Sequence, residues 1–389
     1  MTNGVFMYLS RLLSPPTRSF FLLGPRGTGK STWLKQVYPG ALHIDLLRND
    51  VYFALASSPA HFRARVLAVD PKKTWIIVDE IQRLPILLND VHSLIEDHGY
   101  RFALSGSSAR KLKCNKANLL AGRAIVKHLY PLVFAELGDV VTLDEALQFG
   151  TLPSAVMDKA SRIDYLESYV GTYLREEIRE EALTRNVNAF GRFLEVAALM
   201  HGQGVNLSNI ARDAGVSRNT VTTYFDILTD TLLGAWLPAW RPKAKVKEVA
   251  HPKFYFFDNG VVRAIQKNLR ELLGGSERGV LFETTVFNEL NARIAYSDDG
   301  GELFYWRTPE GSEVDFIWKR GQRVVAIEVK SSARWRDEFN VGFKSLLNSS
   351  VKVNACYGVY LGDEVLKKEF GFVYPWPVFL EKLGAGEII

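Results

Sequence analysis

The residues with the clearest chemistry form a glycine-rich loop near the N-terminus. Residues 24–31 have the pattern Gly-x-x-x-x-Gly-Lys-Ser and follow the apolar run 20–23. In such a loop, backbone N–H groups surround the phosphates of a nucleotide, the lysine reaches the β and γ phosphates, and the serine ligates Mg²⁺. The loop therefore predicts a site for ATP with Mg²⁺. Its expected nucleotide-binding residues are Gly24, Pro25, Arg26, Gly27, Thr28, Gly29, Lys30, Ser31 and Thr32.

Two adjacent carboxylates, Asp79 and Glu80, extend this chemistry at the end of the strand-like run 74–78. Buried parallel strands place ligands at their carboxyl ends. We expect Asp79 to hold Mg²⁺ together with Ser31, and Glu80 to act in catalysis with Lys30 by polarising the attacking water. An isolated acidic pair is often only a solvated turn, but the P-loop upstream favours the catalytic interpretation.

Further polar residues are candidates for sensing or stabilising the γ-phosphate. Ser105 and Ser107 follow the strand-like run 100–104, and either can be the sensor unless the segment is an ordinary loop. Arg123 is the first candidate for a catalytic arginine that stabilises the transition state, in its own or a neighbouring subunit, and Arg110 is the second. A surface or salt-bridged role for Arg123 is an equally open alternative.

The middle of the chain predicts a helix over 161–185 and then a helix-turn-helix over 207–224. Gly215 suits the turn and Ser217 suits the cap of the second helix. The runs 232–240 and 253–257 predict the paired strands of a wing with a basic loop. Some modules of this kind bind duplex DNA, and others serve only for protein packing, so both interpretations stay open. The expected DNA contacts are Arg218, Asn219, Thr222, Arg241, Lys243, Lys245 and Lys247.

Four residues in the last third form a candidate nuclease site: Glu283, Asp315, Glu328 and Lys330. A helix over 279–294 precedes three strand-like runs, 303–307, 313–318 and 324–330. Residues two apart in a strand share a face, so Glu328 and Lys330 project together, beside Asp315 on the adjacent strand. Carboxylates of this kind bind Mg²⁺, and a neighbouring lysine positions water for attack on a phosphodiester. An ordinary amphipathic hairpin, or a binding module without cleavage, remains open.

These segments together resemble the AAA+ branch of P-loop ATPases, and more closely a prokaryotic AAA+ family whose members carry a C-terminal domain of unknown function. The order Glu…Asp…Glu-x-Lys resembles the PD-(D/E)xK restriction-endonuclease-like superfamily. The one departure is at 150–153, Gly-Thr-Leu-Pro, where a second glycine is expected. The matching segments are 24–32, 79–82, 104–108, 120–123, 131–137, 254–260 and 327–332.

The resemblance implies an α/β chain with three parts. They are an AAA+ P-loop ATPase domain at 1–160, a helical connector and winged helix-turn-helix at 161–260, and an α+β restriction-endonuclease-like domain at 261–389. Because AAA+ sites usually lie between subunits, the resemblance also implies a homo-oligomer, with a ring among the forms it can take.

Composition sets the remaining bounds. The chain has 389 residues, a net charge of +5 and 47% hydrophobic residues, which is ordinary for a globular protein and permits a nucleic-acid partner. Its two cysteines, Cys114 and Cys356, have no metal-ligand spacing. No apolar run reaches the ~18 residues of a spanning helix, and no signal-peptide pattern is present. We therefore expect a cytoplasmic protein without a membrane partner.

Two hypotheses for function follow. In the first, the chain is an ATP-hydrolysing enzyme that binds or processes DNA. In the second, it is a nucleotide-dependent switch or scaffold that uses the winged helix and the nuclease-like fold only for protein contacts. The basic wing favours the first hypothesis, and the weakly charged second helix of the helix-turn-helix favours the second.

Overall fold

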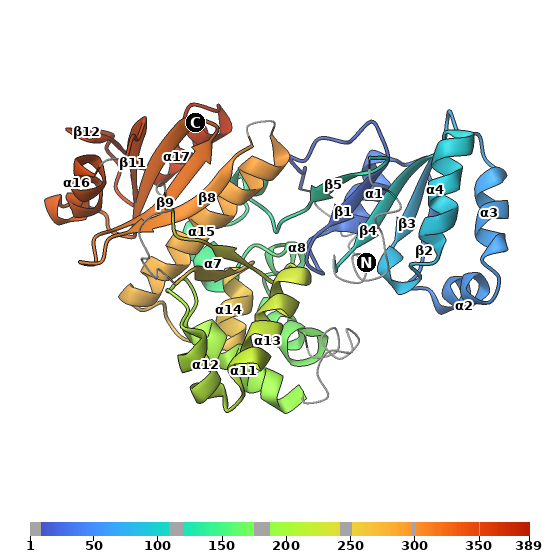
Figure 1. Cartoon of the computed structure of the whole chain (residues 1–389), viewed down its shortest axis with the longest axis horizontal. Coiled ribbons are helices and arrows are strands. Elements are labelled where there is room, and N and C mark those ends of the chain that lie inside the picture. Colours follow the sequence, from blue (N-terminus) through green and yellow to red (C-terminus); the bar gives the residue numbers. More distant parts are fainter. Residues whose placement is uncertain are drawn as a thin grey trace. The chain divides into compact units, whose positions relative to one another are not determined.

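The computed structural model describes residues 9–108, 120, 122–174, 187–241, 251–297, 300–349 and 351–389, which belong to two compact units (Figure 1). The N-terminal unit consists of Arg11–Pro131 with Ile227–Leu233. The C-terminal unit takes the described residues of Leu132–Asp226 and Gly234–Ile389, with Leu9 and Ser10. The predicted boundary at residue 160 thus falls inside the C-terminal unit, and the predicted boundary at 260 does not divide it.

A five-stranded parallel sheet forms the centre of the N-terminal unit, in the order β2-β3-β4-β1-β5. Its strands are β1 (Phe20–Leu23), β2 (Leu42–Asp45), β3 (Trp75–Asp79), β4 (Arg101–Gly106) and β5 (Ile125–His128). The strand β1 lies between β4 and β5, with Leu22 opposite Ser105 on one side and Lys127 on the other. All five carboxyl ends therefore meet at one edge of the sheet.

Helices cover both faces of this sheet. They are α1 (Lys30–Val37), α2 (Asn49–Ser57), α3 (Ala60–Leu67) and α4 (Leu87–His98), with a 3-10 turn η1 (Ile81–Arg83). On one face, Leu55 of α2 and Phe62 of α3 pack in one core with Ile76. On the other face, the rings of Phe20 in β1 and Trp33 in α1 meet edge to face with centroids 6.3 Å apart. The parallel strands are thus buried on both sides, as their apolar sequences require.

The C-terminal unit contains a six-stranded mixed sheet, in the order β12-β13-β11-β10-β9-β8 (Figure 1). Its strands are β8 (Glu302–Arg307), β9 (Glu313–Arg320), β10 (Arg323–Lys330), β11 (Ala355–Tyr360), β12 (Leu366–Lys368) and β13 (Gly371–Pro375). The first three form the antiparallel meander that the sequence predicts, with Ile327 opposite Phe316. The strand β11 then pairs in parallel with β10.

Two layers of helix cover this second sheet. They are α15 (Gly275–Tyr296), the short η4 (Asp337–Asn340), α16 (Val341–Asn348) and α17 (Trp376–Gly384). Phe282 of α15 and Phe379 of α17 share one core with Ile327. Phe343 of α16 packs in a separate core with Ala326, the neighbour of Ile327. Because successive side chains of a strand point to opposite faces, β10 contributes to both cores.

Helices and a two-stranded hairpin lie between the two sheets in the sequence. They are α6 (Phe134–Leu137), α7 (Leu143–Phe149), α8 (Pro153–Met157), α9 (Arg162–Ser168), the π-helical η3 (Tyr169–Leu174), α11 (Val187–Leu199), α12 (Leu207–Ala214), α13 (Arg218–Asp230), β6 (Gly234–Leu237), β7 (Lys253–Phe256) and α14 (Asn259–Ile265). The predicted helix over 161–185 is an α-helix only to Ser168, and residues 175–186 lie outside the described residues.

The two helices predicted over 207–224 are present as α12 and α13. Gly215 joins them with a φ of 67°, a left-handed conformation that glycine adopts without strain. The hydroxyl of Ser217 accepts the N–H of Thr220 at 3.1 Å, which is the predicted cap. The strands β6 and β7 then pair antiparallel, with Gly234 opposite Phe256.

Buried polar contacts explain why the predicted boundaries do not separate compact parts. The carboxylate of Asp258, which precedes α14, accepts the N–H of Thr151 at 2.7 Å. A Cβ on Gly260 would lie 2.2 Å from the carbonyl oxygen of Phe149, so α7 and α14 need a glycine there. The family pattern expects a second glycine in this segment. The contact with Asp258 uses only the backbone N–H of Thr151, so it does not require that glycine. The segments around 150 and 258 are therefore one structure.

The hairpin is also joined to the second sheet by backbone hydrogen bonds. Trp240, which follows β6, donates its N–H to the carbonyl of Tyr305 in β8 at 2.6 Å. His201 contacts both β7 and α15. Its Nδ1 accepts the N–H of Phe256 at 3.1 Å, and its Nε2 lies 2.7 Å from the hydroxyl of Thr284. Burial lowers the pKa of His201 to about 3, so the ring stays neutral. Among the described residues, no helix is long and apolar enough to cross a membrane.

A buried carboxyl predicts how the stability of the C-terminal unit depends on pH. Burial raises the pKa of Glu289 in α15 from 4.5 to about 8, although its side chain accepts the N–H of Phe134 at 2.7 Å. Below pH 4.5 both the folded and the unfolded chain hold this proton. Between pH 4.5 and about pH 8 only the folded chain holds it. The free energy of unfolding should therefore fall by about 1 kcal/mol per pH unit between about pH 5 and pH 8.

Urea denaturation followed by tryptophan fluorescence measures this slope. Glu289→Gln keeps an acceptor for Phe134 and should flatten the slope, while Glu302→Gln at an exposed position should not. Equal slopes in wild type and Glu289→Gln would show that Glu289 is ionised in the folded chain.

Candidate functional site

The loop after β1 has the geometry of a phosphate cradle. Gly27 and Gly29 have φ values of 84° and 87°, which aim successive backbone N–H groups to one side of the loop. A Cβ on Gly24 would lie 2.3 Å from the carbonyl oxygen of Leu129, so the loop passes too close to the chain after β5 for any side chain. The ammonium of Lys30 is buried and donates to the carbonyls of Gly24 (2.8 Å) and Pro25 (3.1 Å).

Arg11 holds this loop from outside, and sequence reasoning missed it. Its guanidinium donates to the carbonyl of Thr28 at 2.8 Å and to the carbonyl of Tyr130 at 2.6 Å. The P-loop is therefore tied to the segment that leaves β5. No local pattern marks Arg11, because both of its partners are backbone groups far away in the sequence.

Asp79 lies at the carboxyl end of β3, where the sequence predicts it. Its carboxylate accepts a hydrogen bond from the hydroxyl of Ser105 in β4, and Nε2 of His43 in β2 lies 3.8 Å away. Burial raises the pKa of Asp79, but the nearby His43 and hydrogen bonds from Ser105 and Ser31 outweigh burial and hold that pKa below its ordinary value. Asp79 is therefore ionised beside the hydroxyl of Ser31, and the pair offers two oxygen ligands to a hard divalent cation.

Glu80 follows directly and is held by two polar side chains. Its backbone is left-handed, with a φ of 57°, which turns the side chain away from the line of the strand. The amide nitrogen of Gln82 donates to the Glu80 carboxylate and lies 3.1 Å from the hydroxyl of Ser107, which itself donates to Glu80 at 3.3 Å. Ser105 thus contacts Asp79 and Ser107 contacts Glu80. Gln82 is a functional candidate that the sequence analysis did not single out.

The candidate catalytic arginine lies elsewhere. Arg123 precedes β5, so it lies at the edge of the sheet opposite the P-loop, and it forms an ion pair with Glu96 of α4. The structure does not bring Arg123 to the nucleotide site of its own chain. Arg110 lies outside the described residues.

The predicted DNA contacts are partly described. Arg218, Asn219 and Thr222 are exposed on α13, and Arg241 is exposed after the hairpin strand β6. These side chains lie on the second helix of the helix-turn-helix and beside the hairpin, as the sequence predicts. Three predicted contacts lie outside the described residues: Lys243, Lys245 and Lys247.

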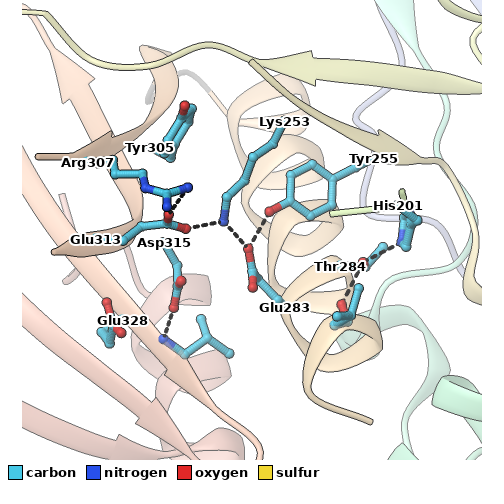
Figure 2. A network of polar contacts seen from close by, with 12 residues as sticks. His201, Lys253, Tyr255, Glu283, Thr284, Tyr305, Arg307, Glu313, Asp315 and Glu328 are labelled. Carbon is cyan, nitrogen blue, oxygen red and sulfur yellow. Dashed lines mark hydrogen bonds and ion pairs between the residues drawn. The ribbon is translucent and has the colours of Figure 1, made fainter. Parts of the chain in front are cut away.

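The candidate nuclease residues do come together. The ammonium of Lys330 forms ion pairs with Glu328 and, at 3.8 Å, with Asp315 on the neighbouring strand (Figure 2 shows both carboxylates). One oxygen of Asp315 also accepts the N–H of Val329 at 2.7 Å. Burial and the nearby Asp315 raise the pKa of Glu328 well above its ordinary value. Glu283 of α15 faces the same region (Figure 2).

A second lysine, which sequence reasoning missed, completes this network. Lys253 of β7 is 5% exposed and its ammonium lies 2.9 Å from Glu283 and 2.7 Å from Glu313 (Figure 2). Tyr255 of the same strand also donates its hydroxyl to Glu283. Burial alone would lower the pKa of Lys253. The charges of Glu283 and its neighbours have the larger effect, and the net result is a pKa well above the ordinary value. The hairpin therefore supplies a permanent cation to the carboxylates of the second sheet.

The carboxylates of this network do not form a ready metal site. Within the part of the chain that the structure describes, no group of three or more His, Cys, Asp or Glu side chains is arranged to hold a metal ion. Two ammonium groups, Lys253 and Lys330, lie between the carboxylates where a cation would bind. We therefore derive no cleavage step from this cluster.

Three family descriptions match separate parts of the chain. An "AAA domain" matches residues 16–138, a "Domain of unknown function (DUF8612)" matches 141–271, and a "Domain of unknown function (DUF4143)" matches 278–379. Residues 16–138 are thus similar to an AAA domain, and they include the P-loop, Asp79 and Ser105. The two segments that follow match domains of unknown function.

The matching relatives carry no functional description. Uncharacterized protein Rv2008c of Mycobacterium tuberculosis is 26% identical over 326 residues, 80% of this chain and 70% of that protein. An uncharacterized protein of Haemophilus influenzae is 26% identical over 276 residues, 66% of each chain. The crystal structure of protein VC1899 from Vibrio cholerae matches 95% of this chain and 97% of that one at 10% identity, but with a TM-score of 0.20 it supports no argument.

Lys253 should be essential for the stability of the C-terminal unit. Lys253→Met leaves the partly buried Glu283 and Glu313 without their cation, and this should lower the free energy of unfolding by about 3–5 kcal/mol. Adding Glu283→Gln to Lys253→Met removes one stranded charge and should restore part of the loss. Urea denaturation at neutral pH measures both. A loss below about 1 kcal/mol would mean that the pair behaves like an exposed salt bridge.

Proposed function

We propose that the AAA domain binds ATP with Mg²⁺ and hydrolyses it. The observation that carries this proposal is the convergence of Lys30, Asp79 and Ser105 at one edge of the parallel sheet. The glycine-rich cradle fits phosphates, and the ionised Asp79 beside Ser31 fits a divalent cation. Mg²⁺, when bound there, neutralises phosphate charge and makes the γ-phosphate a better target for water.

In this proposal each residue at the edge has one task. Lys30 exchanges the two loop carbonyls that it contacts for β- and γ-phosphate oxygens, which are charged and therefore stronger acceptors. Glu80 accepts a proton from the attacking water and orients it in line with the γ-phosphate. Gln82 and Ser107 fix the carboxylate of Glu80 in place. Arg11 holds the loop in place, because its guanidinium links the carbonyls of Thr28 and Tyr130.

Two substitutions separate binding from turnover. Lys30→Ala should abolish binding of a fluorescent ATP analogue, because it removes the cation of the cradle. Glu80→Gln should bind the analogue normally but slow phosphate release by about a hundredfold or more. Lys35→Ala and Asp97→Asn, at exposed positions of the same unit, serve as controls. Normal turnover by Glu80→Gln would remove Glu80 from its role.

We further propose that the helix-turn-helix of the C-terminal unit contacts DNA. The exposed polar side chains of α13 and Arg241 beside the hairpin support this proposal, as does the net charge of +5. The competing function is a nucleotide-dependent switch or scaffold, in which α13 makes only protein contacts. Phosphate contacts release counterions, whereas protein packing does not, so salt dependence distinguishes the two.

Arg218→Ala should weaken binding to a fluorescent DNA duplex and make the dependence of log affinity on log salt shallower by about one unit. Lys344→Ala, an exposed cation on α16, is the matched control and should change neither quantity. Fluorescence anisotropy over a series of salt concentrations measures both. Absence of salt-dependent binding by the wild type would favour the switch or scaffold.

A further inference from the structure

The C-terminal unit contains a pocket of about 790 Å³, one wall of which is the segment that precedes the helix-turn-helix. Its lining includes Gly202 and Gly204, from the segment between α11 and α12, and Lys253 of β7. Tyr305, Arg307 and Glu313 of β8 and β9 also line it. A pocket of this size holds a nucleotide-sized ligand.

Four charged side chains give the pocket its chemistry. The ammonium of Lys253 has two carboxylate partners, Glu283 and Glu313, although one would neutralise its charge. The guanidinium of Arg307 is 53% exposed and, among the described residues, its one ion pair is with Glu313 at 3.7 Å, beyond hydrogen-bond distance. The donors of Arg307 are thus weakly used. Guanidinium donors of this kind bind the paired oxygens of a phosphate.

Glu313 therefore holds the position that an anionic ligand would take. Its carboxylate lies between the two cations, Lys253 and Arg307, and its side chain is 27% exposed (Figure 2). It begins β9, directly after the turn at Gly311, whose φ is 93°. Glu283 alone can keep Lys253 neutralised when Glu313 moves away.

We propose that this pocket binds a phosphodiester of a DNA strand, and that Glu313 is an internal anion that competes with it. The proposal rests on the proposed DNA contact and names a second site for it. Continuity of the chain supports this choice of ligand. Gly202, at the pocket wall, donates its backbone N–H to the strand β7 at 2.9 Å. Val205, which follows the pocket-lining Gly204, donates its N–H to Pro252 at 2.9 Å, and α12 begins two residues later. The pocket wall and the helix-turn-helix are thus joined by a short stretch of chain.

The test relies on a gain of affinity, which damage to the fold does not produce. Glu313→Gln keeps an acceptor for Lys253 but removes the competing charge. It should bind a fluorescent duplex with a short single-stranded overhang about fivefold more tightly than wild type, with a salt slope steeper by about one unit. Arg307→Ala should bind the same probe about fivefold more weakly, with a shallower slope.

The controls separate this site from long-range charge effects. Glu302→Gln and Arg323→Ala make the same charge changes at exposed positions of the same sheet and should leave affinity within about twofold of wild type. Thermal unfolding checks that each variant is folded. Unchanged or weaker binding by Glu313→Gln would overturn the proposal. An equal gain toward an acidic peptide would assign the pocket to carboxylates instead of DNA.

The outcome also distinguishes this proposal from the one on which it depends. If wild type and Arg218→Ala bind the duplex as proposed but Glu313→Gln gains nothing, only the pocket proposal fails. If no variant binds DNA with salt dependence, the DNA contact itself fails, and the pocket proposal fails with it.

Discussion

The nucleotide site depends on one constraint, the parallel pairing of β1 with β4 and β5. This pairing aligns the carboxyl ends of the strands, so that residues far apart in the sequence become neighbours at one edge. Leu22 lies opposite Ser105, and the hydroxyl of Ser105 in turn contacts Asp79 of β3. The P-loop begins at the same edge, where the backbone of Gly24 accepts no side chain because Leu129 lies too close. A shift in the register of β1 would separate the cradle from the carboxylates.

The C-terminal unit follows a different principle, in which buried charges join the helical module to the sheet. Lys253 of the hairpin reaches Glu283 of α15 and Glu313 of β9, so one ammonium links three elements. Breaking such a pair is costly because it leaves a partly buried charge without its partner. The ammonium groups of Lys253 and Lys330 stabilise the carboxylates and also occupy the place that a metal ion would take. Stability and metal binding are thus alternatives at this cluster, and the structure favours stability.

The sequence alone located the candidate groups whose members are neighbours in the chain. The P-loop, the pair Asp79 and Glu80, and the meander that carries Asp315 and Glu328 are local patterns, and each lies where the spacing predicts. The AAA domain at 16–138 agrees with the first of these. Contacts between distant segments were not predicted. Arg11, Gln82, Lys253 and Glu313 acquire their roles only from partners that the fold brings near, and the segment 150–153 joins α14 through a buried Asp258 that no pattern marks.

The first measurement to make is phosphate release from ATP by the purified wild-type chain, with and without Mg²⁺. If the P-loop, Ser31 and Asp79 form one site for nucleotide and metal, as we propose, turnover is repeated and stops when a chelator removes Mg²⁺. Tight binding of ATP with no phosphate release in Mg²⁺ would show that this site does not hydrolyse ATP. In that case the edge of the sheet would be a nucleotide-binding switch and Glu80 would not act on water.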